Sequence, residues 1–423
     1  MPERECQITD YNSRRTVNGL LDTGSNPVYS IEKRPFTGRF SFEKFWKIQS
    51  DMEERGGVME HRQTVTYEIM HLDRRVASVD TAGRSRVYFR SFLPYNLFLE
   101  EERDIDTLVN NLTNFYYWCS SRVLTLDRTY AKALLNSIGM QQAVTDKERA
   151  AIALTYRCAS ITDVFWVRKK GEKVTFSQIN LYENHLENTF LDISLRGRQY
   201  SVQNQALARD LSTNGCFPKA WRRTAQGFQL LKDGGQETVA REVLASRICR
   251  CFDVAQVLYE EGTFDGEKVS VSENMTSPAL SIASMEALSI WLANHDKNVE
   301  KYVLSLDRHG YYMMNVIDYL VGNTDRHWGN WGVLVDTRTN RPLSLHPLMD
   351  FNQSFLAYDT LDGANCQTLF GRRGTQRQAA EEAVRKIGLS QIKEIGRDIF
   401  RDLPQYEDMF FQRFHHLQGI AKK

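Results

Sequence analysis

The segment from Tyr311 to Asp350 constrains the fold more than any other part of the sequence. Residues 311–321 (YYMMNVIDYLV) place apolar side chains at helical spacing, and this pattern ends at Gly322, a residue type that commonly terminates a helix. A polar loop follows as far as Asn330. The pattern beyond it predicts a strand, a turn and a short returning strand, at 331–335, 336–340 and 342–345. We therefore predict a helix, a polar loop and a hairpin that returns Asp350 to the side of Asn330.

Three side chains of this segment have the chemistry and the order that phosphoryl transfer needs. The reaction uses one carboxylate near the attacking hydroxyl, then an Asn and a second carboxylate that hold the metal bridging the phosphates. Asp325, Asn330 and Asp350 fill these roles in order. Two protein oxygens suffice, because Mg²⁺ completes its octahedron with water and substrate phosphates.

Other interpretations of the loop remain. Asn, Thr, Asp and Gly also form turns for purely structural reasons. His327 either hydrogen-bonds Asp325 or a phosphate, or is a local structural residue. A metal hydrolase built on Asp325 and His327 is disfavoured, because no cluster of His or Cys with zinc-ligand spacing accompanies them.

An ATP-using enzyme also needs a phosphate cradle upstream, and residues 212–219 (STNGCFPK) offer one ahead of a predicted β-hairpin. Small residues let backbone amides approach phosphate oxygens, while lysines meet the negative charge. The candidate phosphate-binding residues are Ser212, Thr213, Asn214, Gly215, Lys219 and Lys232. Hairpins that contain Gly and Lys also occur for local structural reasons, so this motif indicates a phosphate site only because it lies upstream of the Asp325 loop.

Two further candidates follow the hairpin. The pattern of residues 237–251 predicts a helix that contains Glu242. A helix Glu paired with a strand Lys is how protein kinases fix the phosphate-binding Lys, although Glu242 beside Arg241 equally fits a solvated face. Residues 268–272 alternate like a strand. They lead into Glu273 and Met275. In a kinase, this is the position of the interlobe linker, which offers backbone groups to adenine; the alternative is an ordinary strand end.

Taken together, these residues resemble the HipA family of bacterial serine/threonine kinases, over roughly Tyr67 to Lys423. The family's phosphate loop, Ser-x-x-Gly-x-x-x-Lys, is matched by Ser212, Gly215 and Lys219. Its later ATP-contacting Lys, its catalytic Asp and its metal-binding Asn and Asp are matched by Lys232, Asp325, Asn330 and Asp350. The resemblance implies a two-lobed, protein-kinase-like α+β fold, related to phosphoinositide kinases, that uses ATP and Mg²⁺.

The resemblance also implies regulation and a partner. Ser212 is expected to be autophosphorylated, which in HipA expels the loop and switches the kinase off; the alternative is a plain turn hydroxyl. HipA-like kinases commonly act in toxin-antitoxin pairs with a separate DNA-binding partner, and we expect no direct contact between this chain and nucleic acid. Two departures stand out: residues 350–352 (DFN) lack the third-position Gly of eukaryotic protein kinases, and Pro218 stiffens the phosphate loop.

Composition agrees with a globular protein of two or three domains, with 423 residues of which 42% are hydrophobic. The formal charge of +1 gives no bulk electrostatic reason to expect nucleic acid or a membrane as partner. Seven dispersed cysteines without a C-x-x-C pair, a polar N-terminus and no membrane-length apolar run predict reduced thiols in the cytoplasm.

Changes of pattern along the chain predict its domains. An N-terminal extension at 1–63 precedes an α+β domain at 64–195, a small lobe with the phosphate loop at 196–277, and a helical large lobe with the catalytic loop at 278–423. Within the α+β domain we predict strands at 65–72, 75–79 and 86–92, helices at 104–120 and 129–137, and a core element at 164–167. The tail from Gln376 is predicted to be helical, with a break at Leu403-Pro404.

The sequence thus predicts a kinase that transfers the γ-phosphate of ATP to a hydroxyl. The resemblance implies that the acceptor is a protein Ser or Thr, whereas the pocket chemistry suits an inositol lipid or a small molecule equally well. A second hypothesis is a non-catalytic nucleotide-binding module or toxin partner. The presence of Asp325, Asn330, Asp350 and Lys232 argues against it.

Overall fold

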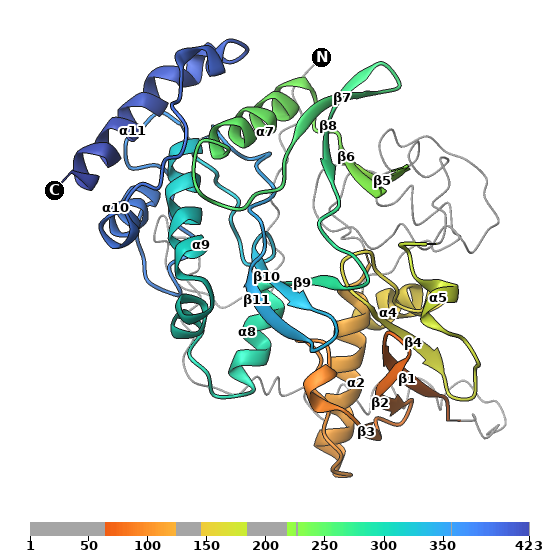
Figure 1. The fold of residues 1–423 in the computed structure, drawn as a ribbon. Coiled ribbons are helices and arrows are strands. Elements are labelled where there is room, and N and C mark those ends of the chain that lie inside the picture. Colours follow the sequence, from red (N-terminus) through yellow and green to blue (C-terminus); the bar gives the residue numbers. More distant parts are fainter. Residues whose placement is uncertain (1–63, 124–144, 184–217, 226, 357, 423) are drawn as a thin grey trace, which may run out of the picture. The chain divides into compact units, whose positions relative to one another are not determined.

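A computed structural model describes residues 64–123, 145–183, 218–225, 227–356 and 358–422, all of which belong to one compact unit (Figure 1). Two predictions lie outside the described residues. These are the helix at 129–137 and the phosphate loop that contains Ser212, Thr213, Asn214 and Gly215.

An antiparallel sheet with the order β3-β2-β1-β4 combines the first three strands of the described chain with one strand from beyond the gap at 124–144. Its strands are β1 (Thr66–His71), β2 (Arg74–Asp80), β3 (Ser85–Val87) and β4 (Phe165–Lys169). The first two strands and the core element confirm the predictions. The predicted strand 86–92 is wrong beyond Val87, because the amides of Tyr88 and Phe89 both donate to the carbonyl of Val76, which ends the ladder. The chain turns instead into a short 3-10 helix, η1 (Arg90–Phe92).

Helix α2 (Ile105–Ser120) and helix α4 (Asp146–Thr155) pack against each other and share a core with this sheet. Helix α2 begins where predicted, since the side chain of Asp104 accepts a hydrogen bond from the Thr107 amide as an N-cap. Its buried side carries Phe115, Trp118 and Cys119. Another short helix, α5 (Phe176–Ile179), follows β4.

The predicted hairpin after Pro218 is confirmed and belongs to a second antiparallel sheet, with the order β5-β6-β8-β7. Its strands are β5 (Lys219–Thr224), β6 (Gly227–Lys232), β7 (Glu260–Phe264) and β8 (Glu267–Glu273). Helix α7 (Gln236–Cys249) starts after Gly235, which has a φ of 84°, and packs against β8. This geometry places the helix against the strand that pairs with β6, the strand that ends in Lys232.

The largest hydrophobic core surrounds helix α9 (Val299–Val321), against which α10 (Gln376–Ile387) and α11 (Glu407–Ala421) pack (Figure 1). The helix ends at Gly322, whose φ of 61° is left-handed, as predicted. It begins well before the predicted 311, with a kink at Asp307. The predicted break at Leu403-Pro404 is real, but it starts earlier, because α10 already ends at Gly388.

A third antiparallel sheet, with the order β11-β10-β9, carries the chain from the loop after α9 back toward Asp350. It consists of β9 (Leu280–Ser284), β10 (Gly332–Asp336) and β11 (Arg341–Leu345), and helix α8 (Met285–Ala293) follows β9. The hairpin β10-β11 confirms the predicted strand, turn and returning strand. Short 3-10 helices, η3 (Arg397–Phe400) and η4 (Pro404–Tyr406), connect α10 to α11.

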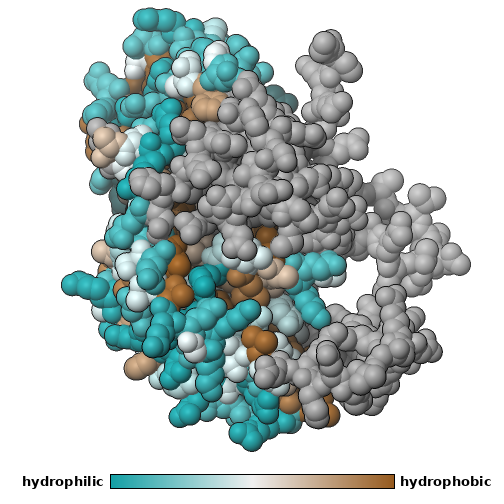
Figure 2. Space-filling view, turned by 90° about the vertical axis from the view of Figure 1, so that its right-hand side faces the viewer, coloured by the Kyte–Doolittle hydropathy of each residue, from teal (hydrophilic) through white to brown (hydrophobic). Residues whose placement is uncertain are grey.

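The described part of the face shown in Figure 2 is mostly hydrophilic, with small separate hydrophobic groups. Within the described ranges, no helix is both long and apolar enough to cross a membrane.

Candidate functional site

The loop after α9 brings Asp325 and Asn330 together, as their spacing predicts. The side-chain amide of Asn330 donates to the carbonyl oxygen of Asp325 at 2.8 Å and to its Oδ2 at 3.2 Å. The Asp325 amide donates to Oδ1 of Asn323 at 3.1 Å, which fixes the start of the loop. Burial raises the pKa of Asp325 and the nearby negative charge of Asp350 adds to this, against the opposing effect of His327. This carboxylate therefore holds a proton more readily than a solvated one.

Of the roles considered for His327, its hydrogen bonds show the local structural one, and a role toward Asp325 or a phosphate stays a prediction. Its Nδ1 accepts a hydrogen bond from the Gly329 amide at 3.0 Å, and its carbonyl accepts one from the Asn330 amide, so it shapes the turn. Because Nδ1 is an acceptor, the neutral ring carries its proton on Nε2. That nitrogen lies 3.9 Å from Oδ1 of Asp325, on an exposed side of the loop.

Lys232 lies between two carboxylates. Its Nζ is 2.7 Å from Oε1 of Glu242 on α7 and 2.9 Å from Oδ1 of Asp350. Glu242 is only 1% exposed, which excludes the solvated-face alternative, and its other oxygen accepts a hydrogen bond from the hydroxyl of Ser270 on β8. The structure therefore joins residues from β6, α7 and the segment after β11 in one buried ion cluster.

The electrostatics of this cluster hold Lys232 and Asp350 charged. Burial alone would lower the pKa of Lys232, but the charges of Asp350 and Glu242 outweigh it and raise that pKa. Burial alone would likewise raise the pKa of Asp350, yet the charges of Lys232 and Lys219 hold it well below its usual range. Asp350 also has a left-handed φ of 61°, a strained backbone geometry for a residue other than glycine, of the kind that concentrates at functional sites.

Lys219, the other predicted phosphate-binding lysine, lies at the start of β5 and pairs in register with Lys232. It is buried, and its charge acts on Asp350. The structure thus brings the two lysines and Asp350 into one charged region, and phosphate binding by the lysines stays a prediction.

The linker candidates Glu273 and Met275 lie further from this cluster. Glu273 is exposed at the end of β8, where its carboxylate accepts a hydrogen bond from Gln229, and Met275 packs against the core around α9. Within the described residues, no hydrogen bond or ion pair joins either of them to Lys232. The structure places them at the exit of the sheet rather than among the charged groups.

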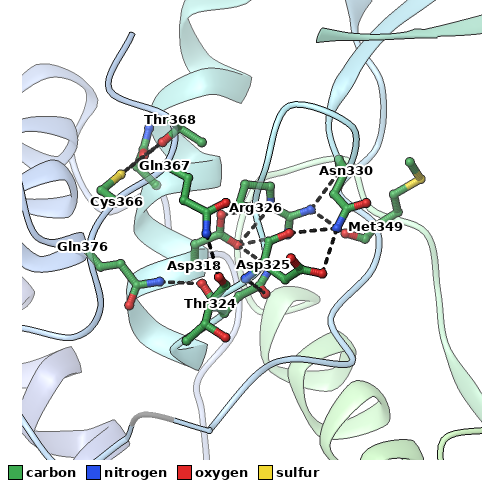
Figure 3. A network of polar contacts seen from close by, with 12 residues as sticks. Asp318, Thr324, Asp325, Arg326, Asn330, Met349, Cys366, Gln367, Thr368 and Gln376 are labelled. Carbon is green, nitrogen blue, oxygen red and sulfur yellow. Dashed lines mark hydrogen bonds and ion pairs between the residues drawn. The ribbon is translucent and has the colours of Figure 1, made fainter. Parts of the chain in front are cut away.

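Arg326 is a central residue of the site that the sequence analysis missed (Figure 3). It is 3% exposed and forms a two-pronged ion pair with Asp318 on α9, with Nε to Oδ2 at 2.9 Å and Nη2 to Oδ1 at 2.9 Å. Its Nη1 donates to the carbonyls of Asn330 and Met349. One guanidinium therefore ties the helix, the Asp325 loop and the residue before Asp350 together.

A sequence signal for this network did exist. Asp318 is the one charged residue within the mostly apolar stretch 311–321. A carboxylate on the buried side of a helix requires a charged or hydrogen-bonding partner, and the nearest arginine in sequence after it is Arg326.

The residues proposed to hold a metal have suitable oxygens. Among the hydrogen bonds of the described residues, none reaches Oδ1 of Asn330 or Oδ2 of Asp350, and amide and carboxylate oxygens are the donors that Mg²⁺ prefers. No group of three or more His, Cys, Asp or Glu side chains in the described part of the chain has a metal-binding arrangement. The donor set therefore fits a metal that takes most of its ligands from water and phosphate.

Comparison with known proteins addresses the fold. No protein-family model matches this sequence, and neither does any curated protein sequence. Solved structures do match, and they define the class as a two-lobed, protein-kinase-like α+β fold with an additional N-terminal α+β portion.

The particular structure that carries this assignment is the Shewanella oneidensis MR-1 toxin-antitoxin system of HipA, HipB and operator DNA. The matched chain is 11% identical, the match covers 84% of this chain and 99% of that chain, and the TM-score is 0.50. A crystal structure of the Helicobacter pylori proinflammatory kinase CtkA also matches, at 15% identity over 49% of this chain and 90% of that chain, with a TM-score of 0.37. The match to the Shewanella structure confirms the HipA-like fold that was predicted.

Proposed function

We propose that this protein is a kinase that transfers the γ-phosphate of Mg-ATP to a hydroxyl group. The observation that carries the proposal is the placement of Lys232 between Glu242 and Asp350. Arg326 holds the Asp325 loop against the residue before Asp350. This arrangement supports a site in which a phosphate-binding lysine, a metal-binding carboxylate and a base act on one substrate.

Each residue has a role that follows from its position. Asp325, with its raised pKa, orients the acceptor hydroxyl and takes its proton. His327 presents Nε2 to the same carboxylate and assists it. Lys232 and Lys219 bind phosphate oxygens, and Glu242 keeps Lys232 aimed. We further propose that Ser212, Thr213, Asn214 and Gly215 cradle the phosphates, and that Glu273 and Met275 border the adenine.

Asn330 and Asp350 would hold Mg²⁺ through the oxygens described above. When bound there, Mg²⁺ would supply positive charge that stabilises the negative charge developing during phosphoryl transfer. In the structure Lys232 contacts Oδ1 of Asp350, so Oδ2 would be the oxygen of this carboxylate that is available to a metal.

We propose a protein Ser or Thr as acceptor, because the motifs Ser212-x-x-Gly215-x-x-x-Lys219 and Asp325 to Asn330 resemble those of the HipA family. The matched Shewanella structure contains HipB and operator DNA. By analogy we propose a separate DNA-binding antitoxin as partner of this chain. The described cysteines are free thiols, which supports the proposed cytoplasmic location.

Intact-mass analysis after incubation with Mg-ATP tests the proposal. We expect the wild type to gain the mass of a phosphate, mapped to Ser212, and Asp325→Asn to gain none. Asp402→Asn is the matched control, since Asp402 is 70% exposed in a surface ion pair with Arg247. A wild type that binds Mg-ATP yet transfers phosphate neither to itself nor to added protein would favour the non-catalytic nucleotide-binding alternative.

A further inference from the structure

Tyr259 is a buried side chain that contacts both halves of the charged cluster and belongs to none of the motifs above. It is 4% exposed and directly precedes β7. Its hydroxyl oxygen accepts a hydrogen bond from the Asp350 amide at 3.0 Å. The Nζ of Lys232 lies 4.7 Å from the centre of its ring. Phe351, the residue after Asp350, packs edge-on against the same ring at 6.3 Å.

The hydroxyl and the ring stabilise different partners. Asp350 has a left-handed φ of 61°, and the tyrosine oxygen satisfies its backbone amide donor. The ring face attracts the ammonium of Lys232 through a cation–π interaction.

We infer that Tyr259 is a positioning residue that fixes the metal-binding carboxylate through its hydroxyl and the phosphate-binding ammonium through its ring. The inference rests on the proposed function, because it assigns Asp350 to the metal and Lys232 to the phosphates. Two parts of the Tyr259 side chain therefore have different effects. The hydroxyl sets the dependence on Mg²⁺, and the ring sets the affinity for ATP itself.

Tyr259→Phe removes the hydroxyl and keeps the ring. We expect the Mg²⁺ concentration at half-maximal ATP binding and at half-maximal phosphotransfer to rise about fivefold, the effect of losing one hydrogen bond. ATP binding measured in EDTA should stay unchanged. Tyr259→Leu removes both groups and should weaken ATP binding in EDTA as well, by about three- to tenfold.

Tyr95→Phe is the matched control. Tyr95 is also buried, and its hydroxyl donates to the Asn340 carbonyl at 2.9 Å, in the turn between β10 and β11. We expect this variant to keep the wild-type Mg²⁺ requirement, so an equal rise in both Phe variants would overturn the inference as a general loosening of the fold. An unchanged Mg²⁺ requirement in Tyr259→Phe would overturn it directly.

Because ATP binding is measured separately from phosphotransfer, a failure of the proposed kinase function can be told apart from a failure of the proposed role of Tyr259. If the wild type binds Mg-ATP but transfers no phosphate, the proposed function fails while the comparison of binding in Mg²⁺ and in EDTA still decides the role of Tyr259. If the wild type does not bind Mg-ATP, both proposals are overturned.

Discussion

Replacing Arg326 with Met tests how much the buried network stabilises the protein. Arg326 and Asp318 have 3% and 7% side-chain exposure, so their ion pair is buried. Without the guanidinium, the Asp318 carboxylate still accepts a hydrogen bond from the side-chain amide of Asn323 at 3.1 Å but loses its charged partner. The carbonyls of Asn330 and Met349 each lose a hydrogen-bond donor. Removing one partner of a buried pair costs about 3–5 kcal/mol.

That loss is a large share of the about 5–15 kcal/mol by which domains are stable. At about 2–4 °C per kcal/mol, Arg326→Met should lower the melting temperature by roughly 6–20 °C, measured by differential scanning calorimetry. At assay temperatures below the melting range, the phosphotransfer rate of Arg326→Met should be at least about 100-fold lower than that of the wild type, because the Asp325 loop loses its anchor to Met349.

Two further variants test whether the loss of stability in Arg326→Met comes from breaking the buried ion pair. Arg247→Met breaks an exposed pair with Asp402 and should cost less than about 1 kcal/mol. The double variant Asp318→Leu/Arg326→Met leaves no unpaired buried charge, so it should melt above Arg326→Met. If Arg326→Met melts within about 2 °C of Arg247→Met, or if the double variant melts lowest of all, the argument that this pair is a buried anchor is refuted.

Other expectations follow from single residues. His346 is buried, and burial lowers its pKa to about 4 from the ordinary 6.5. The unfolded chain therefore takes up a proton first, and stability of about 3 kcal/mol, fully present above pH 6.5, should be lost as the pH falls to about 4. Urea unfolding across this range should show a shallower slope with pH in His346→Gln. Gly322→Ala should cost about 1–3 kcal/mol in the same assay, because φ is 61° and an added Cβ would lie 2.5 Å from the ring of Tyr358; a change below 0.5 kcal/mol would contradict this. Glu242→Gln should lower kcat/KM for ATP about 10- to 100-fold by leaving Lys232 with one carboxylate. Steady-state kinetics that match the wild type would show that the pair is dispensable.

Local patterns predicted the elements that are marked by residues close together in the chain. β1 and β2 each contain a short run of mostly buried residues, and α2 has an Asp cap and an apolar stripe, so their ends fell close to the predicted positions. The first half of α9 was missed because it is charged, partly exposed and kinked at Asp307, so no apolar stripe marks it. Strand β3 ended early through a hydrogen bond to Val76 that no local pattern reveals.

The residues of the candidate site were also predictable where they lie close together in the chain, and less so where they come from distant segments. Asp325 and Asn330 lie on one loop, and Lys232 is only ten residues from Glu242, so spacing alone was informative. Lys232 and Asp350 are 118 residues apart, and only the order of the motifs linked them. Tyr259 was missed because its role arises from burial and from contacts with distant segments, which its neighbours in sequence do not encode.

The central claim is that Asp325 and the Lys232–Asp350 cluster transfer a phosphate from ATP. The most direct test incubates the protein with γ-labelled ATP, Mg²⁺ and a mixture of unstructured Ser- and Thr-containing proteins, and measures label bound to protein. The account predicts incorporation by the wild type that is lost in EDTA, in Asp325→Asn and in Lys232→Met, and retained in Asp402→Asn. Equal incorporation by the wild type and Asp325→Asn would contradict it.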